Sequence, residues 1–370
     1  MKLSICRVTY TIYPDSVGGH SIFCHELSLR QVRIGHKIYV LTWNKKNLQR
    51  IETMAEGYSI IRLNKVWMPW DSIGMTNPLL PSLYGSIKSL KTDLIDAHAH
   101  LFFTTAIAVK AARDEEKPVI TTVHGLIAKR DIIANMAQYA YLWSVGAWAL
   151  KNSTKVVCLT ESEAKEVMKL GVKRKNIEII PIAIDVEKFS PSSLEKGYLL
   201  WIGRLVKEKG IEFLLKAMKL LKEKVKLIIV GDGPLRKNLM HEALSMGLKN
   251  EVLFIKEASR EQVIKLLQEC SLFILPSLRE GLPMVLLEAM ATGKPIAASN
   301  IQSFKEVLKE FGVFFNPYDP QSIAEAISLL LNDFKLRKSL GAAGRELVEE
   351  KYSWNAVLPK IEWLYEEVLR

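Results

Sequence analysis

The segment from Leu275 to Gly293 reads LPSLREGLPMVLLEAMATG and carries the strongest structural signal in the chain. An apolar strand ends at Pro276, and a loop with Glu280 and Gly281 leads into an apolar helix. We expect Pro283 in the first turn of this helix, where its missing N–H costs nothing. The unpaired N–H groups and the positive dipole end of such a helix suit a phosphate. The segment therefore predicts an α/β domain with an anion site at a strand end.

The same alternation of short β-rich runs and longer helical patterns extends in both directions. The first set of expected strands is 2–10, 36–42, 58–63, 94–98, 118–124 and 155–159. The second set is 198–202, 226–230, 251–255, 272–275, 295–298 and 312–314. Repeated βαβ units indicate parallel sheets. We expect two doubly wound, Rossmann-like domains facing a ligand-binding cleft.

The expected domains are residues 1–184 and 185–353. Residues 181–197 interrupt both periodicities and are the best linker candidate. Residues 354–370 form a terminal helix, which we expect to pack back on the first domain. A length of 370 residues with 49% hydrophobic and 25% charged residues fits two globular domains.

The net charge of +11 is concentrated in the first half, where residues 1–185 hold 24 basic against 16 acidic side chains. Such a surface suits an anionic membrane face or a phosphate-bearing lipid. A solvated basic surface is an equally good interpretation. We expect no nucleic-acid partner, because no nucleic-acid motif accompanies the charge.

The four cysteines are far apart and show no Cys-x-x-Cys spacing, which indicates reduced, buried thiols rather than a disulfide scaffold or a zinc site. The first residues are interrupted by Lys2 and Arg7 and resemble a strand more than a signal peptide. No apolar window is long enough to span a bilayer. We expect a cytoplasmic protein, at most peripheral at the inner membrane face.

Two glutamates flank the predicted anion site. Glu280 precedes the helix and Glu288 lies within it. A carboxylate is a poor phosphate ligand but a good acceptor for sugar hydroxyls, so the pattern favours a ligand with phosphates between two sugars, which is a nucleotide sugar. Two unrelated glutamates are the alternative, and the helix start between them makes it the weaker one.

A second charged loop, Gly203 to Gly210 (GRLVKEKG), directly follows the strand 198–202. Arg204 and Lys209 can both point toward a ligand from this loop. Two fixed cations would stabilise a departing pyrophosphate without a metal. The alternative is an ordinary charged turn, which fits Lys207 and Glu208.

The motifs together resemble glycosyltransferase family 4, the retaining enzymes with the GT-B fold. The resemblance rests on GRLVKEKG (203–210), IIVGDGPLR (228–236) and LREGLPMVLLEAMATGKP (278–295). Weaker matches are VGGH (17–20), TTVHGL (121–126) and YSWNAVLPKIEWLY (352–365). The resemblance covers nearly the whole chain, and its C-terminal motifs are specific in combination.

This resemblance implies that residues 1–184 bind the acceptor and that residues 185–353 bind the nucleotide sugar. It also implies roles for individual residues of the second half. Arg204 and Lys209 would bind the donor diphosphate, Glu288 the ribose hydroxyls, and Glu280 the transferred sugar. The backbone amides that would face the distal phosphate or the sugar are those of Gly281, Leu282 and Met284. Gly233 would flank the nucleotide pocket, although an ordinary βα turn explains it at least as well.

In the first half, Gly18 and Gly19 would form a loop that closes over the phosphates, and His124 would bind a sugar hydroxyl. Any tight βα turn needs such glycines, so this pair is weak evidence. His98 and His100 also end a strand; packed or acceptor-facing roles are favoured over a metal pair. We expect no metal site and no required cofactor.

The expected reaction is transfer of a hexose from a UDP- or GDP-linked sugar by metal-independent, same-face displacement, because no carboxylate is evident as a nucleophile. Two departures from the family pattern leave the donor contacts of the interdomain loop and the identity of the nucleotide open, in that order. Pro181-Ile182-Ala183 replaces the family's Pro-Asn-Gly, and Lys256-Glu257 stands where a glycine is common.

The acceptor is open among a lipid, a saccharide and a small molecule. The aromatic residues of the first half could contact a membrane or a lipid: Trp67, Trp70, Tyr139, Tyr141, Trp143 and Trp148. Interior packing is the slightly favoured alternative for them. Rival functions are a nucleotide-sugar-binding sensor or complex partner without transfer activity, an epimerase, and a glycogen- or starch-type synthase.

Overall fold

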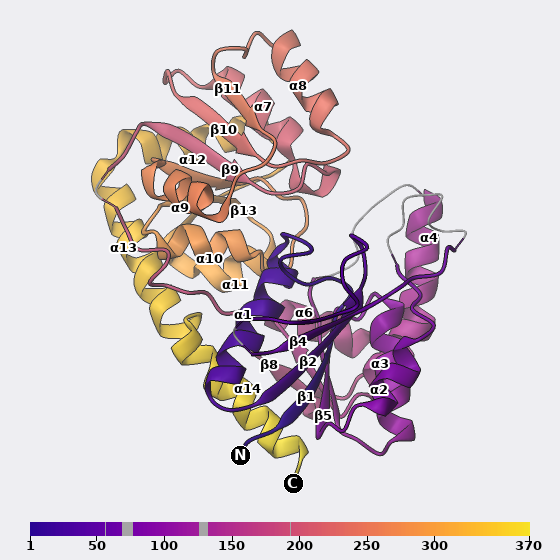
Figure 1. Ribbon diagram of the computed structural model, residues 1–370. Coiled ribbons are helices and arrows are strands. Elements are labelled where there is room, and N and C mark those ends of the chain that lie inside the picture. Colours follow the sequence, from indigo (N-terminus) through magenta and orange to yellow (C-terminus); the bar gives the residue numbers. More distant parts are fainter. Residues whose placement is uncertain (56, 69–76, 126–131, 193) are drawn as a thin grey trace. The chain divides into compact units, whose positions relative to one another are not determined.

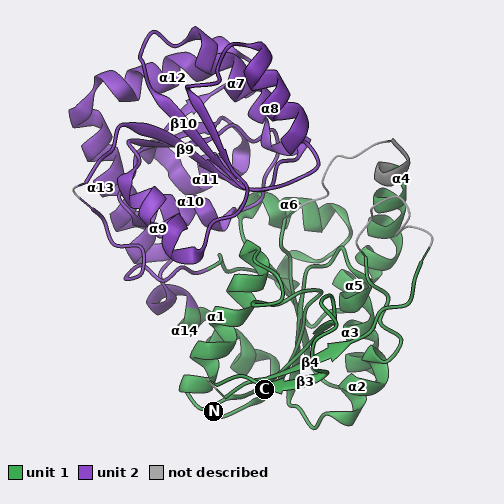
Figure 2. Ribbon diagram, turned by 45° about the horizontal axis from the view of Figure 1, so that its top comes forward, with its two compact units in different colours: residues 1–182, 358–370 green, residues 183–357 purple. Residues whose placement is uncertain are grey.

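The computed structural model describes residues 1–55, 57–68, 77–125, 132–192 and 194–370. The chain forms two units, each built around one sheet (Figure 2). Unit 1 is Met1–Ile182 with Leu358–Arg370, and unit 2 is Ala183–Val357. Unit 1 is therefore discontinuous in sequence, because its last helix follows the whole of unit 2.

The sheet of unit 1 has the strand order β3-β4-β2-β1-β5-β6-β7-β8. Its strands are β1 (Ser4–Val8), β2 (Lys37–Trp43), β3 (Ile51–Thr53), β4 (Ser59–Leu63), β5 (Leu94–His98), β6 (Val119–Thr122), β7 (Lys155–Cys158) and β8 (Ile177–Ile179). All neighbours are parallel except β3, which is antiparallel to β4. The six predicted strands are present. The prediction missed the two edge strands β3 and β8, whose three residues are too few to show a period.

Helices cover both faces of this sheet (Figure 1). They are α1 (Gly19–Arg33), α2 (Leu83–Ser89), α3 (Phe103–Asp114), α4 (Ile132–Tyr141), η2 (Leu142–Gly146), α5 (Ala147–Asn152), α6 (Glu161–Lys169), η3 (Arg174–Asn176) and the end of α14 (Trp354–Val368). Ile95 and Ala97 of β5 join the core beneath α2 and α3. The alternate residues Asp96 and His98 therefore face α1 and α14.

Unit 2 contains a fully parallel sheet in the order β11-β10-β9-β12-β13-β14. Its strands are β9 (Tyr198–Ile202), β10 (Lys226–Val230), β11 (Val252–Ile255), β12 (Leu272–Leu275), β13 (Ile296–Ser299) and β14 (Gly312–Phe315). Its helical elements are η4 (Lys207–Lys209), α7 (Ile211–Leu220), α8 (Arg236–Ser245), α9 (Arg260–Glu269), α10 (Met284–Ala291), α11 (Gln302–Leu308), η5 (Lys309–Phe311), α12 (Pro320–Asn332) and α13 (Phe334–Lys351). All six predicted strands are present within one residue at each end, so the α/β prediction is confirmed.

Both sheets reverse their strand order beside a central strand. In unit 1, β1 pairs with β2 on one side and β5 on the other. In unit 2, β9 pairs with β10 and β12. In open parallel sheets ligands bind beyond the carboxyl ends of the strands at such switch points. The loops after β1 and β5, and after β9 and β12, are therefore where a site is expected in each unit.

All four cysteines are buried and unpaired. Among the described residues, no helix combines the length and hydrophobicity needed to cross a bilayer.

Candidate functional site

In unit 2, the loops after β9 and β12 pack backbone against backbone. The Leu278 amide donates to the Glu208 carbonyl oxygen (2.8 Å). A Cβ atom on Gly210 would lie 2.1 Å from the Pro276 carbonyl oxygen, and Gly210 has a φ of +64°. Glycine is required here for both reasons. The two loops that carry the predicted ligands are thereby fixed to one another.

The loop after β10 approaches the loop after β9 in the same way. A Cβ atom on Gly233 would lie 2.3 Å from the Leu205 carbonyl oxygen, and the Leu205 amide donates to the Asp232 carbonyl oxygen (2.9 Å). Close backbone packing therefore accounts for Gly233. Its expected place beside a nucleotide stays a prediction.

Lys209 and Glu280 meet at this switch point. The Lys209 ammonium forms an ion pair with Glu280 Oε2, and both side chains are about four-fifths buried, with 19% and 18% exposed. The Ser277 hydroxyl donates to the same carboxylate (3.3 Å), and the Ser303 hydroxyl donates to the Glu280 carbonyl oxygen (2.8 Å). The sequence predicted both residues as ligands, and the structure brings them into direct contact.

The start of α10 presents unpaired donors beside this pair. Pro283 precedes the helix as its N-cap rather than lying in the first turn as expected, so the helix begins one residue later. The amides of Gly281, Leu282 and Met284 donate to no acceptor among the described residues. They remain available, together with the positive helix end, for an anionic ligand.

Glu288, deeper in α10, is buried and forms an ion pair with Arg260, a residue that the sequence analysis did not predict for the site. Arg260 Nη2 lies 2.6 Å from Glu288 Oε1, with 33% and 4% of the two side chains exposed. The Arg260 guanidinium also lies over the Phe189 ring, 4.7 Å from its centroid. The side chain of Arg204, by contrast, is exposed and makes no hydrogen bond or ion pair with any residue that the structure describes. No motif marks Arg260, because it follows an ordinary capping box at Ser259.

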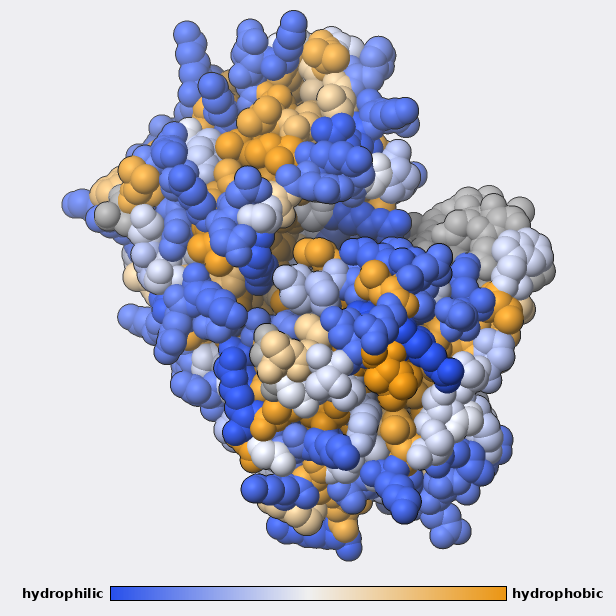
Figure 3. Space-filling view, viewed as in Figure 1, coloured by the Kyte–Doolittle hydropathy of each residue, from blue (hydrophilic) through white to orange (hydrophobic). Residues whose placement is uncertain are grey.

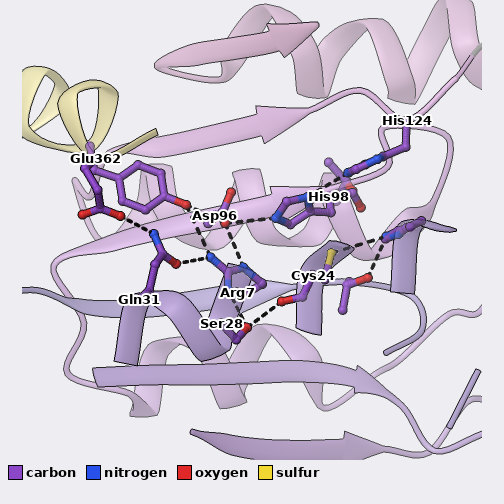
Figure 4. A network of polar contacts seen from close by, with 12 residues as sticks. Arg7, Cys24, Ser28, Gln31, Asp96, His98, His124 and Glu362 are labelled. Atoms are coloured by element: carbon purple, nitrogen blue, oxygen red, sulfur yellow. Dashed lines mark hydrogen bonds and ion pairs between the residues drawn. The ribbon is translucent and has the colours of Figure 1, made fainter. Parts of the chain in front are cut away.

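In unit 1, the corresponding switch point gathers histidines (Figure 4). His98 ends β5, His124 follows β6, and His20 lies in the first turn of α1. His98 Nδ1 is 2.9 Å from His124 Nε2, and the His20 and His124 ring centroids are 4.5 Å apart. His20 Nε2 is 2.9 Å from the Thr9 hydroxyl. The prediction singled out His124, but its contact with His98 could not be read from the sequence.

A buried carboxylate anchors this histidine chain. Asp96 Oδ2 contacts His98 Nε2 (3.0 Å), Arg7 Nε (2.9 Å) and the Tyr365 hydroxyl (2.7 Å). Burial opposes the charge of Asp96, but the neighbouring His98 and Arg7 lower the pKa of its carboxyl. Burial also opposes the charge of His98, but the Asp96 carboxylate raises the pKa of His98 to about 9.

The two other histidines of this group, His20 and His124, have lowered rather than raised pKa values. Burial lowers the pKa of His20 to about 3, and the nearby His98 adds to this effect. Burial also lowers the pKa of His124 well below its usual value, again with contributions from neighbouring imidazoles. Near neutral pH, His20 and His124 are therefore uncharged rings beside a charged His98.

The Arg7 guanidinium extends the network toward α14. It donates to the Ser28 hydroxyl (2.5 Å) and to Gln31 Oε1 (2.6 Å), and Gln31 in turn donates to Glu362 Oε1 (2.7 Å). Gln31 and Glu362 come from helices α1 and α14, so both helices support the strand residues from one side (Figure 4).

His20, Cys24 and His124 place potential metal-ligand atoms within 4.8 Å of one another. However, Nε2 of His20 and Nε2 of His124 already lie in hydrogen bonds to Thr9 and His98. We assign no metal to this group.

Gly18 and Gly19 stand at the start of α1, on the same side of the sheet. Gly18 is the N-cap, with an extended φ of −123°, and a Cβ atom there would meet no atom within 4 Å. Neither backbone strain nor packing demands glycine at Gly18. The expected closure of this loop over phosphates stays a prediction.

The aromatic residues of α4, η2 and α5 form a largely exposed surface. Tyr139 is 43% exposed, Trp143 60% and Trp148 38%. Trp67 is exposed as well, so the favoured interpretation of interior packing is wrong for these four side chains. Tyr141 differs because it is partly buried and packs edge-on against Phe103. Trp70 lies outside the described residues.

Beside this surface, an open groove of about 340 Å³ is lined mainly by apolar side chains, including Phe103, Ile107, Val145 and Trp148. In the space-filling view, apolar patches interrupt a mostly hydrophilic surface (Figure 3).

Comparison with known proteins gives consistent matches along the chain. The family model "Glycosyltransferase Family 4" matches residues 17–188, and "Glycosyl transferases group 1" matches residues 184–347. A UDP-Gal:alpha-D-GlcNAc-diphosphoundecaprenol alpha-1,3-galactosyltransferase of Escherichia coli is 32% identical over 69% of this chain and 70% of its own. An N,N'-diacetylbacillosaminyl-diphospho-undecaprenol alpha-1,3-N-acetylgalactosaminyltransferase of Campylobacter jejuni is 27% identical over 77% and 79%.

Among solved structures, a sucrose-phosphate synthase of Thermosynechococcus elongatus superposes with a TM-score of 0.84 at 20% identity, over 99% of each chain. This likeness confirms the predicted GT-B fold class.

Proposed function

This chain belongs to the group 1, family 4 glycosyltransferases, and from that premise we propose that it moves a hexose from a UDP-linked donor to a lipid-diphosphate-linked saccharide. The observation that supports a nucleotide-sugar donor is the Lys209–Glu280 pair beside the unpaired amides at the start of α10. The proposed acceptor is supported by two relatives whose names specify diphosphoundecaprenol-linked substrates, one of them with a UDP-linked donor.

The donor diphosphate would lie at the start of α10. The free amides of Gly281, Leu282 and Met284 supply hydrogen bonds, and Lys209 and the exposed Arg204 supply positive charge. Glu280 would accept from a hydroxyl of the transferred sugar. Its contact with Lys209 supports this assignment, because the pair would then lie where the phosphate and the sugar of the donor join.

Glu288 would accept from the ribose hydroxyls of the donor. A buried carboxylate is costly unless it is paired. Arg260 provides that pairing at 2.6 Å and leaves the second carboxylate oxygen for a ligand. Arg260 would thus orient Glu288 rather than contact the donor.

The proposed chemistry is same-face displacement with retention. The bond between the anomeric carbon and the phosphate oxygen breaks, and an acceptor hydroxyl forms its bond to the same face of that carbon. The acceptor proton passes to the leaving phosphate oxygen, whose growing charge is stabilised by Lys209, Arg204 and the helix start. No step requires a metal, so EDTA should leave the transfer rate unchanged.

The aromatic surface of unit 1 is the proposed contact with the bilayer. Residues 132–150 contain no charged side chain, and the exposed residues Met136, Tyr139 and Trp143 follow one another at helical spacing. Aromatic and apolar side chains on such a face bind the membrane interface. This arrangement would bring the enzyme to a lipid-linked acceptor.

Donor turnover without acceptor tests the first half of the proposal. Purified protein is incubated with a panel of UDP- and GDP-sugars, and release of free nucleotide is followed. We expect slow hydrolysis of one UDP-hexose. Tight binding without any turnover would favour a sensor, and release of an epimerised nucleotide sugar would favour an epimerase. With an acceptor present, the anomeric coupling constant of the product in NMR tests retention.

Vesicle co-sedimentation tests the membrane contact. We expect binding to anionic vesicles that weakens when Tyr139 and Trp143 are both replaced by serine. Trp363→Ser is the matched control, because Trp363 is similarly exposed (56%) but lies on α14. Equal binding by both variants, or none by the wild type, would argue against this surface.

A further inference from the structure

The hydrogen bond between His98 and His124 can run in two directions. His98 Nδ1 and His124 Nε2 are 2.9 Å apart, so one of these nitrogens carries the shared proton. The other ring nitrogen of His98, Nε2, lies 3.0 Å from Asp96 Oδ2. An ionised carboxylate only accepts, so His98 Nε2 is protonated. The direction of the bond to His124 therefore depends on whether His98 carries a second proton.

The charges around the two rings select one direction. His98 contacts a buried carboxylate that Arg7 and Tyr365 hold in place. Its other titratable neighbours are Cys24, His20 and His124. His124 faces the imidazoles of His20, His98 and His100, and no carboxylate among the described residues contributes to its environment. A positive charge is thus stabilised on His98 and disfavoured on His124. The directions of their two pKa shifts agree.

Solvent has little access to the ion pair between Asp96 and His98. His98 and Asp96 are 1% exposed, and the cavity beside them, lined also by Phe23, Leu27 and Tyr365, measures about 20 Å³. That volume admits no more than a single water molecule. The ion pair of Asp96 and His98 is therefore poorly screened, and the charge remains on His98.

We propose that His98 is a positioning residue, which donates as an imidazolium from Nδ1 to Nε2 of His124 and fixes His124 as the neutral tautomer with its proton on Nδ1. His124 Nδ1 has no hydrogen-bond partner among the residues described around it. His124 then presents a hydrogen-bond donor and not a base. Resting on the proposed function, this donor would meet a hydroxyl oxygen of the donor sugar.

The hydrogen-bond direction can be read by NMR without any activity assay. The full chain is labelled with ¹⁵N-histidine, and long-range ¹H–¹⁵N spectra are recorded at pH 7. The signals are assigned from His98→Gln and His124→Asn variants. We expect the pattern of a doubly protonated ring for His98, and a neutral ring with Nδ1 protonated for His124. A neutral His98 beside a His124 that is protonated on Nε2 would overturn the proposal.

A substitution of Asp96 tests the consequence. Asp96→Asn removes the anion, so His98 should be neutral at pH 7 and His124 should populate both tautomers. We expect kcat to fall by roughly ten- to a hundredfold, the range seen for carboxylates that orient metal-bound histidines, with an ionisation near neutral pH appearing in the rate profile. Unchanged kcat with the altered spectrum would refute the positioning role. The wild-type spectrum needs no substitution, so it tests the proposal even if Asp96→Asn fails to fold or the chain proves inactive on sugar nucleotides.

Discussion

Replacement of Lys209 by glutamine is the sharpest test of the unit 2 site. The substitution keeps most of the side-chain length and removes the charge that faces Glu280 and, in our proposal, the leaving diphosphate. Loss of one fixed electrostatic stabiliser in an active site typically costs 10²- to 10³-fold in kcat, or about 2.7–4 kcal/mol. We expect a loss of that size in kcat, because the charge on the phosphate grows mainly in the transition state.

The same substitution should have a small effect on stability. The Lys209–Glu280 contact is about four-fifths buried on both sides, and Ser277 continues to donate to the carboxylate. Loss of the ion pair should cost about 1–2 kcal/mol, between the values for exposed pairs and for buried charged hydrogen bonds. In a unit of this size that lowers Tm by roughly 2–8 °C. A catalytic loss far larger than the stability loss is the signature of the proposed role.

Lys207→Gln is the matched control, because Lys207 lies in the same 3-10 turn with its side chain exposed. Nucleotide release is measured for both variants at saturating donor and at low donor, with thermal unfolding recorded in parallel. Lys207→Gln should match the wild type. The reasoning fails if Lys209→Gln keeps kcat within threefold of the control.

Two further predictions concern stability. Burial lowers the pKa of His20 to about 3, so the free energy of unfolding should decrease as the pH falls below 6.5. Burial opposes the charge of His98, but Asp96 raises the pKa of His98 to about 9, so the free energy of unfolding should also decrease as the pH rises above 6.5. Calorimetric Tm should therefore peak near pH 6.5, and a steady rise to pH 9 would contradict this. Gly210→Ala should cost more than about 3 kcal/mol, because of its positive φ and the contact with Pro276, whereas Gly18→Ala should cost under about 1 kcal/mol. Denaturant unfolding of the two variants would show the difference, and similar midpoints would contradict the steric argument.

Elements whose residues are contiguous in the sequence could be predicted from it. Buried parallel strands are continuous apolar runs, so the six strands of unit 2 could be located from composition alone. The switch-point loops could be located too, because Gly210 and Pro283 mark a turn and a helix start. Short edge strands such as β3 give no such signal.

Contacts between distant segments could not be predicted in this way. Lys209 and Glu280 are 71 residues apart, and Tyr365 and Asp96 are 269 apart. Each pair depends on strand order, which a single sequence does not specify. Arg7 and Asp96 are the exception, because each is a charge within an apolar strand, and a charge in a buried strand requires a buried partner.

The distance along the chain between Arg7 and Tyr365, 358 residues, has a consequence for biosynthesis. Arg7 is translated near the start, while the helix that completes the shell of Asp96 is translated only after all of unit 2. Until then Asp96 lacks the Tyr365 hydroxyl, and the far side of Gln31 lacks Glu362. Unit 2 is continuous, so all of its residues are available before the end of α14, whereas the last residues of unit 1 emerge after the whole of unit 2. The histidine chain of unit 1 can therefore form before α14 emerges, but the Tyr365 hydroxyl reaches the Asp96 carboxylate behind it only at the end of synthesis.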